Sequence, residues 1–232
     1  MMKLLGILGG LGPLSSAYFY ELITKHTRAV RDQDHIDMII SSRASTPDRT
    51  AFILGRSEED PLPFMIEDAK RLEAYGADAI VIPCNTAHYF IGEVRRSVSV
   101  PVPSIITETC EYVLRHGYKK AAILATEGTI ASRSYQNELD RVGVEWAVPD
   151  ERGMAVLMDI IYGDVKAGHI PGREKIDSVT EPLKESGCDC AVLACTELSL
   201  LKNSLGEDPF FVDSLEALAE HAVKMFGKEY IS

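Results

Sequence analysis

The sequence predicts an α/β protein of two pseudo-symmetric, Rossmann-like α/β/α domains, each with a mostly parallel sheet and with a site in the cleft between them. Short apolar runs alternate with longer amphipathic stretches, which is typical of parallel strands joined by helical crossovers. The stretch 119–128 repeats the pattern of 3–12, so the chain restarts near its middle. The stretch 187–196 repeats the residue types of 76–85, and each copy ends in a cysteine followed by Thr or Asn.

The first half is expected to hold strands at 3–8, 36–41, 79–83 and 102–105, and helices at 14–30, 64–75 and 87–98. The strand runs are apolar and short, as in sheets buried on both faces. Pro13 suits the first turn of a helix, and Gly76 ends one. The segment 42–63 carries prolines, glycines and charges, which predicts a long loop with one helical turn; loops of that length are often functional.

The second half is expected to hold strands at 120–125, 144–148, 190–194 and 210–213, and helices at 107–116, 130–142, 152–167, 173–186, 197–203 and 214–226. Gly117 and Gly143 end two of these helices, and Ser214 can cap the last. We place the domain boundary near Val102. The predicted domains are 1–102 plus 210–232, with the last helix returning to the first half, and 103–209.

Composition excludes several classes of protein. Hydrophobic residues make up 46% of the 232 residues, enough for a sizeable core, and the net charge of −11 argues against a nucleic-acid partner. No apolar run is long enough for a membrane span, and the apolar start lacks a cleavage site, so it predicts a first strand. Five cysteines, an odd count, suggest free thiols and a cytoplasmic location.

Cys84 and Cys195 end the repeated strands. Open α/β sheets bind ligands at this edge, and backbone N–H groups of the following helix can hold a carboxylate or stabilise a thiolate. Lowering a thiol pKa from about 8.5 to about 7 takes about 2 kcal/mol, which a helix start can supply. Two opposed thiols suit stereoinversion at an acidic carbon: one thiolate removes a proton from one face, and the other thiol protonates the opposite face.

Other interpretations of these motifs stay open. A cysteine that ends a strand is commonly a packing residue, so packing is the alternative role for Cys84 and Cys195. Cys110 and Cys188 are expected to be packing residues. The spacing Cys188, Cys190, Cys195 does not match a structural zinc site, so no metal is expected. The glycine-rich turn at 6–12 departs from the dinucleotide fingerprint. His88, one turn after Cys84, is expected to pack or cap rather than to transfer protons.

The segments 84–88 (CNTAH), 195–198 (CTEL) and 9–13 (GGLGP) resemble the aspartate/glutamate racemase superfamily, and its aspartate racemase branch most closely. The resemblance spans nearly the whole chain. It implies cofactor-independent racemisation of an amino acid by Cys84 and Cys195, two α/β domains around a central cleft, and a homodimer.

The resemblance also implies how the substrate is held. Arg49, within 47–50, and Lys166, within 162–168, resemble the branch's Arg and Lys that contact the substrate's side-chain carboxylate, so a dicarboxylic amino acid is expected. The turn around Gly10 is expected to place backbone N–H groups near the α-carboxylate, and Thr126 matches Gly10 in the repeat. The remaining substrate-binding candidates are Asn85, Thr86, Thr196 and Glu197, the last of which either orients the backbone or touches the amine.

Alternatives to an aspartate racemase remain at this point. The chain could racemise glutamate, homoserine or another amino acid, or act on a related carboxylate as superfamily isomerases and decarboxylases do. It could also be a catalytically silent amino-acid-binding protein or a dinucleotide-dependent oxidoreductase. The presence of both Cys84 and Cys195 favours racemisation over decarboxylation by a single thiol and over silent binding. Binding of a nicotinamide cofactor would identify an oxidoreductase.

Overall fold

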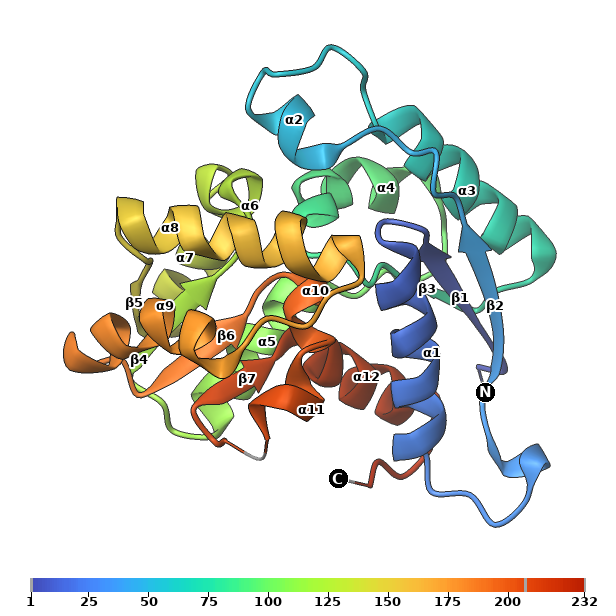
Figure 1. The fold of residues 1–232 in the computed structure, drawn as a ribbon. Coiled ribbons are helices and arrows are strands. Elements are labelled where there is room, and N and C mark those ends of the chain that lie inside the picture. Colours follow the sequence, from blue (N-terminus) through green and yellow to red (C-terminus); the bar gives the residue numbers. More distant parts are fainter. Residues whose placement is uncertain (1, 207, 232) are drawn as a thin grey trace.

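A computed structural model of the chain, which describes residues 2–206 and 208–231, shows two lobes, each built on a parallel sheet (Figure 1). The first sheet has the order β2-β1-β3. Its strands are β1 (Leu4–Gly9), β2 (Asp37–Ser42) and β3 (Ala79–Val81). The accompanying helices are α1 (Pro13–His26), α2 (Arg49–Ile53), α3 (Leu62–Tyr75) and α4 (Ile91–Ser97), with the 3-10 turns η1 (Asp32–Asp34) and η2 (Thr86–Phe90).

The second lobe holds a four-stranded parallel sheet in the order β5-β4-β6-β7. Its strands are β4 (Lys120–Leu124), β5 (Glu145–Ala147), β6 (Cys190–Leu193) and β7 (Phe211–Asp213). The helices are α5 (Ile105–Arg115), α6 (Glu127–Ala131), α7 (Ser134–Val142), α8 (Glu151–Met158), α9 (Arg173–Glu185), α10 (Thr196–Ser199), α11 (Lys202–Leu205) and α12 (Ser214–Met225), with η3 (Asp159–Asp164) and η4 (Val165–Ala167) after α8. The predicted α/β class with parallel sheets is confirmed.

The strands β1, β3, β4 and β6 are buried on both faces because they are apolar along nearly their whole length, whereas the edge strands β2 and β5 are partly exposed. In β1, Leu5 and Ile7 pack with Phe19 of α1, whereas Leu8 points to the other face and packs with Leu72 of α3. All residues of β3 and β6 are buried. The polar chain that follows these two strands therefore emerges at the carboxyl edge of a rigid, covered sheet.

Several predicted elements differ from the structure. Residues 102–105 form no strand, because α5 already begins at Ile105 with Ser104 as its cap. The predicted helix 130–142 is broken at Arg133, whose φ of 55° separates α6 from α7. The predicted helix 152–167 continues from α8 as a π-helical turn and then a 3-10 turn. Among the described residues, no helix combines the length and apolarity that crossing a bilayer requires.

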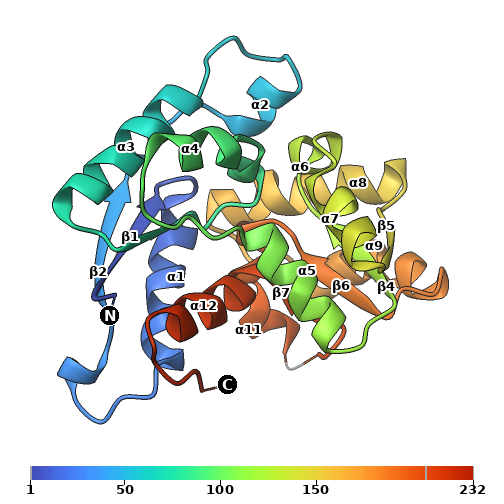
Figure 2. The same cartoon turned by 180° about the vertical axis from the view of Figure 1, so that it is seen from behind.

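The predicted return of 210–232 to the first domain is wrong for its first part. The strand β7 pairs in parallel with β6, so Val212 is buried in the second sheet. The helix α12 that follows lies beside both α5 and α1 (Figure 2). One buried apolar cluster accordingly runs from Phe19 of the first lobe through Leu215 of α12 to Ile123 of the second, so the two lobes share a core.

The sharp turn after β1 depends on Gly10, which has a φ of 83° and on which an added Cβ would lie 2.4 Å from the Arg43 backbone nitrogen. Gly10→Ala is expected to lower the free energy of unfolding by about 3 kcal/mol, because left-handed strain of about 1 kcal/mol adds to a backbone clash. Denaturant unfolding measures this. Gly55→Ala is the matched control, since Gly55 also has a positive φ but faces open space. Equal losses in the two variants would contradict the clash.

Candidate functional site

The two repeated cysteines line one cavity. Cys84 follows β3 and Cys195 follows β6, each at the carboxyl end of its sheet, and each is 5% exposed. The cavity encloses about 310 Å³, part of it open to solvent. It is lined by Leu11, Asp48, Arg49, Thr50, Cys84, Asn85, Thr86, Thr126, Tyr162, Lys166, Cys195, Thr196 and Glu197. The sequence-predicted site residues thus come together there, with the exception of Gly10.

Gly10 lines an adjoining, wider pocket instead. Its backbone N–H donates to Ser16 Oγ at 2.9 Å, and the Ser16 hydroxyl in turn donates to the Gly12 carbonyl oxygen at 2.9 Å. This differs from the expectation that the Gly10 N–H faces a substrate carboxylate, because the serine hydroxyl has taken that donor. The wider pocket encloses about 900 Å³, including open solvent, and shares Asp48, Arg49, Lys166 and Glu197 with the cavity between the cysteines. It forms a mouth to that cavity.

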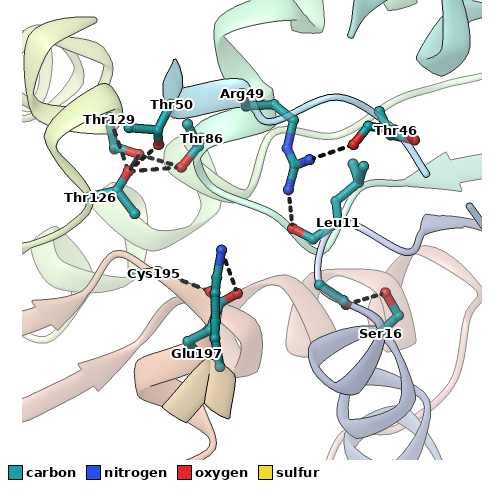
Figure 3. A network of polar contacts seen from close by, with 12 residues as sticks. Leu11, Ser16, Thr46, Arg49, Thr50, Thr86, Thr126, Thr129, Cys195 and Glu197 are labelled. Atoms are coloured by element: carbon teal, nitrogen blue, oxygen red, sulfur yellow. Dashed lines mark hydrogen bonds and ion pairs between the residues drawn. The ribbon is translucent and has the colours of Figure 1, made fainter. Parts of the chain in front are cut away.

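Glu197 lies between Cys195 and a cation. The Cys195 thiol donates to Glu197 Oε2 at 3.0 Å (Figure 3), and Lys166 Nζ lies 3.6 Å from Glu197 Oε1. Burial and then the negative charge of Glu197 raise the pKa of Cys195 well above 9.0. Burial alone disfavours the Lys166 ammonium, but Glu197 and Tyr162 reverse this and raise the pKa of Lys166. This side of the cavity therefore favours a protonated thiol beside a charged lysine.

The charges around Cys84 act on its pKa in opposite directions. Burial raises its pKa above 9.0, while the positive charge of Arg49 opposes the rise and the negative charge of Glu197 adds to it. The Ala87 backbone N–H also favours the Cys84 thiolate, as the Glu197 backbone N–H does for Cys195. The donors at the start of the following helical turn are thus present as expected. They do not lower either thiol pKa, because the loss of hydration is larger than their effect.

Arg49 is held by the backbone but keeps one edge for a ligand. Its Nη1 donates to the carbonyl oxygens of Thr46 (3.3 Å) and Pro47 (2.9 Å), and its Nη2 donates to that of Leu11 (2.9 Å) (Figure 3). Its Nε is buried without a partner among the described residues. A guanidinium has five N–H donors, so Nε–H and one Nη2–H remain. Nε and Nη2 share one edge of the planar group, and an arginine edge of this kind suits a carboxylate.

Four buried threonine hydroxyls meet at the wall between the lobes (Figure 3). The oxygens of Thr86, Thr126 and Thr129 lie 2.9–3.1 Å from one another, and Thr50 Oγ1 lies 3.4 Å from Thr126 Oγ1. They come from α2, η2 and the first turn of α6, where Thr126 is the N-cap. The hydroxyls of Thr86 and Thr126 therefore reach the cavity on a cross-linked support.

Sequence reasoning missed some lining residues. Tyr162 lies with its ring 4.5 Å from Lys166 Nζ, so it flanks the ammonium by a cation–π contact. Four-residue spacing on a helix could have indicated this pair. Asp48 and Thr50 flank Arg49 in the sequence, but only the fold shows that both line the cavity. Thr129 does not line the cavity but supports the hydroxyls of Thr86 and Thr126 that do. No local signal indicates this role, because it depends on the packing of α6 against the first lobe.

His88 is a neutral structural residue. Its Nε2 accepts from the Ile105 backbone N–H at 3.0 Å, so Nδ1 carries the proton and donates to the Cys84 carbonyl oxygen at 2.7 Å. Burial lowers the pKa of His88 to about 4. The ring joins the start of α5 to the backbone of Cys84 and does not line the cavity, as expected for a packing or capping residue.

The other three cysteines are packed in the cores. Cys110 and Cys190 belong to the cluster that joins the lobes, and Cys188 belongs to a second cluster around β6. Burial raises the pKa of Cys190 to about 12. Over 2–206 and 208–231, no group of three or more His, Cys, Asp or Glu side chains is arranged to hold a metal ion.

Comparisons with known proteins agree over nearly the whole length of the chain. The family model described as Asp/Glu/Hydantoin racemase matches residues 8–222. The broad specificity amino-acid racemase RacX of Bacillus subtilis is 30% identical over 229 residues, 96% of this chain and 98% of RacX. The aspartate racemase of Picrophilus torridus has a TM-score of 0.84 at 28% identity and covers 99% of this chain and 96% of its own. An aspartate racemase homologue from Pyrococcus horikoshii has a TM-score of 0.79 at 27% identity, with coverages of 98% and 100%.

Proposed function

The chain belongs to the Asp/Glu/hydantoin racemase family, and from this premise we propose that it racemises aspartate by proton transfer at Cα between two thiols. As an amino-acid racemase of this family it is independent of PLP. The single observation that carries the proposal is the shared cavity. Cys84 and Cys195, from matched strand ends of two lobes, line the same small space as two cations, Arg49 and Lys166.

The cations support a dicarboxylic substrate. In a chain of net charge −11, the cavity holds an ammonium and a guanidinium whose Nε–H has no partner among the described residues. The Arg49 fork would bind the side-chain carboxylate in a bidentate manner, and Lys166 would add a point charge. Lys166 would then exchange part of its contact with Glu197 for the substrate, leaving Glu197 to accept from the substrate ammonium.

The reaction follows from the two sulfur atoms. A thiolate takes the Cα proton, so a Cα–H bond breaks and an S–H bond forms, while the opposite thiol gives its proton to the other face of the carbon. Asn85, Thr86 and Thr196 would hold the α-carboxylate, where negative charge develops, and stabilise it with preorganised donors. The substrate ammonium brings a positive charge to the sulfur, which favours the thiolate that burial disfavours.

A broader substrate range is the second candidate. The mouth of about 900 Å³ adjoins the cation pair and carries apolar side chains such as Leu14 and Val165, so longer side chains have room beside it. The similarity to a broad specificity racemase supports this reading, and the similarity to an aspartate racemase supports the narrower one. Relative kcat/KM values on aspartate, glutamate and neutral amino acids separate them.

The proposal is tested by incubating the protein with L-aspartate in deuterated water. We expect D-aspartate to form with deuterium at Cα. Binding of amino acids without isotope exchange would instead support a silent binding protein and would overturn the proposal.

The homodimer and the cytoplasmic location stay predictions from the sequence. Sedimentation of the purified protein measures whether it is a dimer.

The activity should rise with pH. Because the pKa values of both thiols lie above 9.0, only a small fraction of either is thiolate at neutral pH, and kcat/KM is expected to rise about tenfold per pH unit until the thiolate dominates. The value of kcat/KM is expected to fall again at higher pH, because the second thiol then loses the proton that it has to donate. The resulting bell-shaped profile is that of a coupled pair of titrating groups. The profile of kcat/KM against pH measures this.

Glu197→Gln should move the rising limb of that profile to lower pH. The substitution removes the negative charge that raises the pKa of both Cys84 and Cys195. The control is Glu181→Gln, because Glu181 is an exposed partner of Lys184 far from the cavity lining. If the rising limb of the pH profile lies at the same pH in Glu197→Gln and in Glu181→Gln, the charge of Glu197 does not raise the pKa of the thiols.

A further inference from the structure

A chain of buried hydrogen bonds connects the residue after Cys84 with the strand that leads to Cys195. Tyr135 Oη lies 2.6 Å from Asn85 Oδ1, Asn85 Nδ2 lies 3.0 Å from Ser214 Oγ, and Ser214 Oγ lies 2.7 Å from the Leu193 carbonyl oxygen. The side chains of Tyr135, Asn85 and Ser214 are buried. They come from α7, the start of η2 and the first turn of α12.

The direction of this chain is fixed from one end. The Leu193 carbonyl can only accept, so the single hydroxyl hydrogen of Ser214 is donated to it, and Ser214 Oγ must accept from the Asn85 amide nitrogen. The Asn85 oxygen is then turned to Tyr135, which donates. Burial raises the pKa of Tyr135, so its hydroxyl keeps the proton that this requires. The amide of Asn85 consequently has one allowed orientation, and one Nδ2 hydrogen is left beyond the bond to Ser214.

We propose that Tyr135 and Ser214 are positioning residues which, through Asn85, hold the strand end that carries Cys84 in register with the strand end that carries Cys195. This rests on the proposed two-thiol reaction. Asn85 follows Cys84 directly, and Leu193 is the last residue of β6, two residues before Cys195. The link therefore crosses from one catalytic strand to the other within a few covalent bonds of each sulfur. Neither positioning residue lines the cavity.

The separation of the two sulfurs matters in a specific way. If the link is cut, one thiolate can still remove the Cα proton, but the opposite thiol no longer lies in line to protonate the other face. The thiol that took the proton exchanges it for a hydrogen from the solvent. It then returns this hydrogen to the same face of the carbanion. Exchange with retention increases relative to inversion, which a general loss of stability does not produce.

The test uses Ser214→Ala and Tyr135→Phe in the full chain, with L-aspartate in deuterated water. We expect kcat to fall about 10- to 100-fold, with KM changed much less, because a displacement of about 1 Å is enough for this loss. The ratio of deuterated L-aspartate to deuterated D-aspartate should rise in both variants. In the double variant the loss should not exceed that of the more impaired single variant, because both residues act through Asn85.

The controls remove similar hydrogen bonds elsewhere. Tyr118→Phe removes a hydroxyl that donates to the Pro209 carbonyl, and Ser186→Ala removes one that donates to the Leu183 carbonyl. An exchange-to-inversion ratio in the test variants equal to that in these controls would overturn the inference while leaving the racemase assignment in place. If wild type racemises no amino acid, the proposed function itself fails. Should Tyr135→Phe not fold, Ser214→Ala carries the test.

Discussion

Cys84→Ala and Cys195→Ala are each expected to lower racemisation about 10²- to 10⁴-fold, the range that a positioned acid or base contributes. In the proposed reaction each substitution removes one of the two groups that exchange a proton with Cα, so both directions of racemisation are slowed. The remaining thiolate can still abstract a proton from the enantiomer that presents its Cα–H to it. Each variant should therefore exchange the proton of one enantiomer only, and the two variants should prefer opposite enantiomers. Chiral chromatography with mass spectrometry measures both quantities.

Cys188→Ala is the matched control for the cysteine variants, because Cys188 is similarly buried but its side chain does not line the cavity. It should racemise at the wild-type rate. Full racemisation by either Cys84→Ala or Cys195→Ala would contradict the two-thiol scheme. Loss of activity together with exchange on both enantiomers would mean that one sulfur serves both faces.

Arg49→Ala is expected to lower kcat/KM for aspartate about 30- to 5,000-fold, which corresponds to the roughly 2–5 kcal/mol lost when one partner of a buried charge pair is truncated. The loss for alanine, which has no side-chain carboxylate, should be much smaller. The ratio of the two losses is the informative quantity, because Arg49 also holds the carbonyls of Leu11, Thr46 and Pro47, and their release affects every substrate alike.

Arg49→Lys refines this experiment, since it keeps the charge and loses the fork. It should recover only part of the preference for aspartate. Arg56→Ala is the control: Arg56 lies in the same loop, is exposed and pairs with Glu127 outside the cavity. Equal losses on aspartate and alanine in Arg49→Ala would assign Arg49 to holding the loop rather than to recognising a carboxylate.

The sequence predicted the parts of this molecule that are encoded locally. The cysteines stand at the ends of apolar runs that repeat, so their equivalence could be seen without coordinates. Strand β7 has only three residues, and its partner is decided by contacts distant in the chain, so it was assigned to the wrong lobe. The break at Arg133 was also missed, because one left-handed residue leaves no apolar pattern.

The electrostatics of the site follow a similar division. Donors at the start of the turn after Cys84 could be expected from the order strand, cysteine, helix, and the Ala87 N–H fills this role. The depth at which the two thiols are buried could not be expected from the sequence. It depends on loop 42–63 and on η3 and η4, whose residues line the cavity beside the thiols. Burial reverses the expected direction of the pKa shift. Tyr135 and Ser214 contact Asn85 from α7 and α12. These contacts could not be predicted from the sequence motifs around the two cysteines.

The apolar cluster common to both lobes has a consequence for turnover. Swinging the lobes apart would expose Leu215 and its neighbours to water, at about 25 cal/mol for each Å² uncovered, so wide opening is costly. A substrate would then enter through the wider pocket, past Arg49, Lys166 and Glu197, which line both this pocket and the cavity. In the proposed reaction these side chains would both bind the substrate and control its entry and the release of the product, so product release is expected to limit turnover.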